Sequence, residues 1–262
     1  MTEMTSHTDP GADPPHPYTT AALARLMLSD AHCEVAEAAL KRIGTEGDSS
    51  STVAPGDFVR EAAELMRLAE AVQRRAVIYE RERRTSWEEI GEALGITRQS
   101  AHTRFAEHVK AWREPLDNPE RLHPDGTPDD RRIPYGARYA PGSVVPANGS
   151  AEKTAGLLDE WLRRHNSLAD QEHSVSDGLP RYSTIEMAIL VGDAATRLRR
   201  DQLVPDLQAE ADLWDLRVAL QERMLRESKG EDDLPNGFHQ SLASDRARAK
   251  ALREARDYDS VA

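Results

Sequence analysis

Seven prolines between residues 114 and 150 constrain the fold of this 262-residue chain more than any other feature. Proline lacks a backbone N–H and fixes φ, so neither a helix nor a central strand continues through such a density. The segment also holds several glycines and three aspartate-rich patches. We therefore predict a long linker over residues 114–150, with helical parts before and after it.

Residues 17–113, which precede the linker, are predicted to be helical. Residues 1–16 are rich in Pro, Gly, Asp and His without periodicity, which predicts a disordered tail. Within residues 17–113 a first helix is expected from a Thr19 or Thr20 cap to near Gly44.

A second helix is expected from about Asp57 to Arg84. Its apolar residues recur at alternating steps of four and three, which is the spacing of a stripe packed against another helix. The members of this stripe are Phe58, Ala62, Leu65, Ala69, Val72 and Ala76.

The stretch TSWEEIGEALGITRQSAHTRF, Thr85 to Phe105, predicts two helices joined by a tight turn. Ser86 and Glu89 have the spacing of a capping box, and Gly95 suits the left-handed conformation that ends a helix. Thr97 is the expected cap of the second helix. The inward face of that helix is predicted to be Ala101, Phe105, Val109 and Trp112, at steps of four, four and three.

The outward face of this second helix carries side chains suited to DNA. Arginine pairs bidentately with guanine, and glutamine with adenine, in the major groove. A recognition helix enters the groove by its N-terminal residues, where Arg98 and Gln99 lie, whereas Ser100 and Arg104 at the flanks suit phosphate. The predicted DNA-contacting residues are Thr97, Arg98, Gln99, Ser100, His102, Thr103 and Arg104.

The residues SWEEIGEALGITRQSAHTRF resemble the helix-turn-helix of sigma-factor region 4 and related regulators of high-GC bacteria. A W/Y-x-E-I-G/A-x-x-L-G-I/V-S/T-R-x-x-V/A-x-x-R-L/F pattern recurs there, and in the most similar version a long helix rich in Ala, Leu and Arg precedes it. The resemblance implies a trihelical DNA-binding core in which Arg98, Gln99 and His102 face DNA. It does not extend to the C-terminal half, and no recognisable region-2 sequence for promoter melting precedes it.

The charge distribution is compatible with DNA binding at this stretch. The chain has a formal net charge of −12, but residues 57–113 carry 10 acidic and 11 basic side chains. Residues 97–113 contain four basic side chains and one acidic side chain, that of Glu107. A local basic surface governs phosphate attraction because salt screens charges beyond about 8 Å.

Helical patterns return after the linker, so the chain as a whole is predicted to be all-α. Residues 151–230 are expected to form a C-terminal helical domain, and residues 231–262 a charged terminal helix or tail. Two interpretations of the apolar faces around Trp161 and Trp214 are open. They form the core of a three- or four-helix bundle, or they are in part a surface for self-association or a protein partner.

Other functional classes leave no positive signal in the sequence. The single cysteine, Cys33, excludes a disulfide framework, and the nine histidines show no metal-ligand spacing. Glycine-rich phosphate loops and Gly-x-Ser-x-Gly elbows are absent, so neither an enzyme nor a cofactor is predicted. No apolar run suits a bilayer and no signal pattern opens the chain, which predicts a cytoplasmic protein without membrane contact.

We therefore expect a bacterial, sequence-specific protein that binds double-stranded DNA and regulates transcription. A homodimer or a protein partner is expected through the C-terminal helices, because a lone helix-turn-helix binds tightly mainly as a dimer on two half-sites. One alternative is a helical adaptor or scaffold that uses the helix-turn-helix fold for protein contacts. Another is a plasmid or phage protein of replication or partition. A third is a helical hairpin whose polar face is merely solvated.

Overall fold

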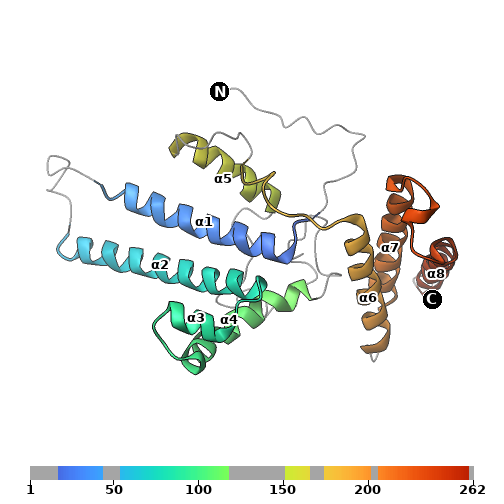
Figure 1. The fold of residues 1–262 in the computed structure, drawn as a ribbon, viewed down its shortest axis with the longest axis horizontal. Helices are drawn as coiled ribbons and strands as arrows, with labels where there is room; N and C mark the ends of the chain where they lie inside the picture. The colour runs from blue at the N-terminus through green and yellow to red at the C-terminus, as the bar shows by residue number, and fades with distance from the viewer. Residues whose placement is uncertain (1–16, 44–53, 118–150, 166–173, 202–205, 260–262) are drawn as a thin grey trace.

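The computed structural model describes residues 17–43, 54–117, 151–165, 174–201 and 206–259, and these ranges are mostly helical (Figure 1). Their α-helices are α1 Thr20–Leu40, α2 Asp57–Glu82, α3 Trp87–Ala93, α4 Arg98–Leu116, α5 Ala151–His165, α6 Thr184–Asp201, α7 Leu207–Glu227 and α8 Phe238–Asp259. Over the same ranges no strand forms, which confirms the predicted all-α class. The predicted tail and all but the first four residues of the predicted linker lie outside the described residues.

Helices α1 and α2 pack side by side as a long hairpin. Thr19 caps α1 by accepting a 3.2 Å hydrogen bond from the Ala22 N–H, as the sequence predicts. Arg75 of α2 joins the two helices, because its Nη1 donates to the Met27 carbonyl at 3.0 Å and lies 3.7 Å from the Asp30 carboxylate.

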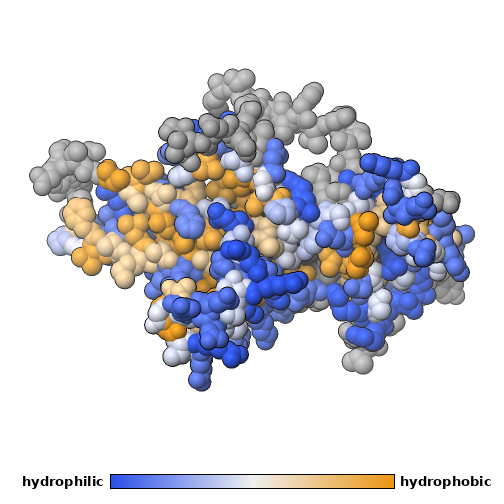
Figure 2. All heavy atoms as spheres, in the orientation of Figure 1, coloured by the Kyte–Doolittle hydropathy of each residue, from blue (hydrophilic) through white to orange (hydrophobic). Residues whose placement is uncertain are grey.

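The predicted stripe of α2 is covered unevenly, because Phe58, Ala62 and Ala69 are exposed whereas Leu65, Val72 and Ala76 are half-buried. Beside the stripe at the C-terminal end, Val77 and Ile78 are each 4% exposed. At the N-terminal end, Phe58 is 73% exposed and the surface is largely hydrophobic (Figure 2). The prediction that the whole stripe packs against another helix is therefore wrong for the first half of α2. Among the described residues α1 packs along α2, whereas α3 and α4 share a core with α2 at its C-terminal end.

Helix α5 packs on α1, where Ala151, Ala155 and Leu158 join its core. The sequence predicts α5 as part of the C-terminal helical domain, because α5 and the helices that follow it all come after the predicted linker. A 3.6-residue apolar face shows that a helix is covered on one side, but it does not name the helix that covers it.

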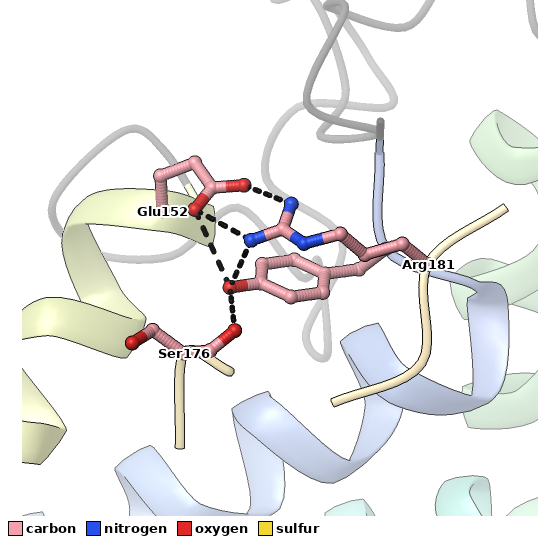
Figure 3. A network of polar contacts seen from close by, with 4 residues as sticks. Glu152, Ser176 and Arg181 are labelled. Atoms are coloured by element: carbon pink, nitrogen blue, oxygen red, sulfur yellow. Dashed lines mark hydrogen bonds and ion pairs between the residues drawn. The ribbon is translucent and has the colours of Figure 1, made fainter. Parts of the chain in front are cut away.

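A buried polar network fastens α5 and the segment before α6 to the start of α1 (Figure 3). The fully buried Tyr18 hydroxyl accepts from Arg181 Nη2 at 2.9 Å and donates to the Ser176 carbonyl at 3.1 Å. Arg181 also binds Glu152 at 3.0 Å, and its guanidinium lies 4.0 Å from the centre of the Tyr18 ring. Burial, followed by the Glu152 charge, raises the pKa of Tyr18 above its ordinary value.

The last three helices form a second core. Val191 of α6, Leu213 and Trp214 of α7, and Leu252 of α8 are each at most 8% exposed. Helix α8, which the sequence predicts as a charged terminal helix or tail, packs one face on this bundle and leaves most of its other residues exposed. Its apolar residues are few, but they share one face against α7.

Candidate nucleic-acid interface

The helix-turn-helix stretch begins with the predicted capping box. Ser86 Oγ accepts from the Glu89 N–H at 3.2 Å, and Glu89 Oε2 accepts from the Ser86 N–H at 2.7 Å. Hydrogen bonds from the Ser86 backbone and side chain hold the pKa of Glu89 below its ordinary value. These contacts fix where α3 starts, and they depend on residues only three positions apart.

The turn between α3 and α4 requires glycine at two positions. A Cβ on Gly91 would lie 2.8 Å from the Ile96 carbonyl oxygen, and the Gly91 carbonyl accepts from the Ile96 N–H at 2.9 Å. Gly95 has a φ of +67°, a left-handed conformation that side chains with a Cβ rarely adopt. The close crossing of the two helices is thus built into the backbone.

Helix α4 begins directly after Thr97, whose Oγ1 accepts from the Ser100 N–H at 3.1 Å. Its inward residues Ala101 and Phe105 are at most 1% exposed and pack with Ile90 of α3 and Val77 of α2. The helix continues to Leu116, three residues beyond the predicted domain end, and the sequence therefore placed the linker slightly early.

Trp112 anchors the far end of α4 to α2. It is 2% exposed, and its Nε1 donates to Glu82 Oε1 at 3.2 Å. Arg113 Nε donates to the same oxygen at 3.0 Å. Val109, the remaining residue of the predicted inward face, is half-buried between two cores.

All seven predicted DNA-contacting residues are exposed, and they lie around the first two turns of α4, with Gln99 and Thr103 on the side away from its core. They are Thr97, Arg98, Gln99, Ser100, His102, Thr103 and Arg104. Their local contacts differ: the Thr97 and Ser100 hydroxyls bond each other at 2.9 Å, and His102 packs edge-on against the Trp87 ring with centroids 5.3 Å apart. The cap thus engages Thr97 and Ser100, while Arg98, Gln99 and Thr103 extend outward from the helix.

The basic side chains of this region divide into two groups. Arg113 is paired with Glu82, so it contributes less to the predicted basic strip than its charge suggests. Arg98, Arg104 and Lys110 form no ion pair with any residue that the structure describes. The positive potential of α4 therefore comes mainly from these three side chains.

Arg84 is an exposed basic residue that the sequence pattern did not single out. It lies between α2 and α3 with a φ of +69°, where a non-glycine residue is strained by roughly 1–3 kcal/mol. Arg83 beside it pairs with Glu80, whereas the Arg84 side chain forms no ion pair with any described residue. Nothing in the sequence marks this conformation, because glycine or asparagine is the usual residue there.

Metal ligands, the single cysteine and apolar helices are the other features of the described ranges that bear on function. No three His, Cys, Asp or Glu side chains gather there in a way that would hold a metal ion. Burial and the neighbouring Glu37 carboxylate raise the pKa of Cys33 to about 11. None of these helices combines the length and the apolar character that crossing a bilayer requires.

Comparisons of the chain with protein-family models, curated proteins and solved structures return no match. The chemistry of α4 is accordingly interpreted from its own residues. Its first two turns combine unpaired cations, amide and hydroxyl groups on a rigidly seated helix, which is a composition suited to an anionic, hydrogen-bonding polymer.

Proposed function

We propose that this chain is a sequence-specific DNA-binding protein, a bacterial transcriptional regulator that reads the major groove with the first turns of α4. The observation that supports this proposal most is the division of α4 into two faces. Ala101 and Phe105 are buried, whereas Gln99 and Thr103 on the opposite side are exposed, and Arg98 is exposed at the first residue of the helix. A helix held at one angle by a tight glycine turn presents such a face as a rigid unit.

Each side chain has a distinct expected role in the complex. Arg98 and Gln99 are proposed to contact base edges, because both side chains form bidentate pairs with purines. Thr103 and His102 flank them, and the Trp87 ring restricts the orientation of His102. Arg104 is proposed to bind phosphate, which positions the helix without reading sequence.

The test begins with selection of bound DNA from a random pool, followed by fluorescence anisotropy on the selected sequence. Arg98→Ala and Gln99→Ala should each weaken binding by about 5- to 150-fold, since a bidentate base contact discriminates by roughly 1–3 kcal/mol. Lys250→Ala on α8 is the matched control, because it also removes an exposed charge, and it should bind as the wild type does.

Unchanged affinity of both α4 variants, with unchanged thermal stability, would contradict the assignment. Arg104→Ala should instead reduce binding to selected and unselected DNA alike and flatten the dependence on salt. Selection that enriches no sequence would favour the adaptor alternative.

A further inference from the structure

The end of the α1–α2 hairpin exposes the most accessible large apolar side chains of the described chain. Ile43, Phe58, Val59 and Met66 are 77%, 73%, 74% and 68% exposed, and Leu40 beside them is 49% exposed. We call these five residues the hairpin-end patch. The hairpin extends there beyond α3, α4 and α5, and hydrophobic surface gathers at this end (Figures 1 and 2).

On α2 this patch has the geometry of an open helix-packing seam. Phe58, Val59, Ala62 and Met66 recur at three- to four-residue spacing and therefore share one face. Ala62, Ala63 and Ala69 are also exposed, and such small residues let another helix approach closely. The seam runs over about 20 Å of helix at 1.5 Å per residue.

The arginines around the seam are paired within α2, while Glu61 forms no ion pair with any residue that the structure describes. Arg60 pairs with Asp57, Arg67 with Glu64, and Arg74 lies 4.0 Å from Glu70. The seam therefore offers no unpaired arginine to an acidic partner, in contrast to α4. Its best complement is another apolar helix face of balanced charge, and a second copy of the same hairpin supplies one.

We propose that the hairpin-end patches of two copies of this chain pack together, so that two α1–α2 hairpins form a four-helix interface. Alternating large and small residues along the seam, Phe58 and Met66 against Ala62 and Ala69, provide the knobs and holes for such packing. The isologous contact leaves α4 of each copy outside the interface, since α3 and α4 pack at the other end of α2.

This surface differs from the one that the sequence suggested for self-association. Leu213 and Trp214 of α7 are 2% and 8% exposed, so they are engaged in the core of their own bundle. The hairpin-end patch, in contrast, leaves its large side chains in solvent. The proposal goes beyond DNA binding and does not require it, because the contact is between protein surfaces alone.

The test is sedimentation velocity of the full chain without DNA, over about 1 to 100 μM, because dimer formation depends on concentration. The wild type should shift from monomer to dimer as the concentration rises. Val59→Glu combined with Met66→Glu should weaken association by about tenfold or more, since each places a charge in the apolar seam. The control, Ile185→Glu with Ile189→Glu, alters apolar residues on α6 that are 47% and 57% exposed and should still dimerise.

Three results would overturn the proposal: a wild type that stays monomeric over the whole range, a seam variant that dimerises as the wild type does, or a control that loses dimerisation to the same extent. Circular dichroism should show that the seam variant keeps its helices, because both altered side chains are exposed. If helicity falls, Val59→Thr with Met66→Gln provides the same comparison without buried charge. DNA binding is measured separately, so one proposal can fail while the other stands.

Discussion

The two ends of α2 carry similar apolar residues but differ in what covers them. At the C-terminal end, Val77 packs into the core beneath α4 and Ile78 into the core shared with α1. At the N-terminal end, Phe58 and Met66 lie in solvent. A helix with apolar residues on more than one side needs more than one neighbour, and within the part of the chain that the structure describes the core contacts of α3 and α4 lie at the C-terminal end of α2.

A continuous apolar pattern shows that a helix has residues to bury, but it does not show that one chain buries them all. The C-terminal end of α2 supports the helix-turn-helix, and its burial determines the angle of α4. The N-terminal end is available for a partner. Three substitutions along α2 test this division.

Ile78→Ala should produce the largest loss. The side chain is 4% exposed, so its truncation leaves a cavity in the core between α1, α2 and α4. The free energy of unfolding should fall by about 2–5 kcal/mol in urea denaturation. A loss below about 1 kcal/mol would contradict the burial of this end of α2.

Arg75→Ala should have an intermediate effect. It removes the hydrogen bond to the Met27 carbonyl and the ion pair with Asp30, both partly shielded between α1 and α2. The expected cost is about 1 kcal/mol by the same measurement. Arg67→Ala is the control, because this arginine is solvent-exposed and paired with Glu64 on its own helix, and its loss should change stability by no more than about 0.5 kcal/mol.

Phe58→Ala should have the smallest effect on the isolated chain, although it removes more apolar atoms than Ile78→Ala. In dilute protein the free energy of unfolding should change by less than about 0.5 kcal/mol, since the side chain is 73% exposed. At high concentration the wild type should melt at a higher temperature than in dilute solution, and this gain should shrink in the variant. Equal losses for Phe58→Ala and Ile78→Ala in dilute protein would remove the distinction between the two ends.

Much of the candidate interface could be predicted because it depends on local contacts. The capping box of Ser86 and Glu89, the left-handed Gly95, the Thr97 cap and the buried Ala101 and Phe105 involve residues within one or two turns of each other. Interactions at this range are encoded by residue type and spacing. The bases or partner contacted by the exposed face of α4 stay a prediction, since exposure by itself does not define a ligand.

The helices, their caps and the turn that seats α4 follow from residue type and spacing, because these features are satisfied by neighbours along the chain. The packing of α5 on α1 and of α8 on α7, and the left-handed conformation of Arg84, depend on the folded arrangement. The same holds for the exposure of Phe58 and Met66 in the first half of α2. Burial depends on which surfaces meet across long sequence separations, and the residues of an apolar face do not specify which helix packs against it.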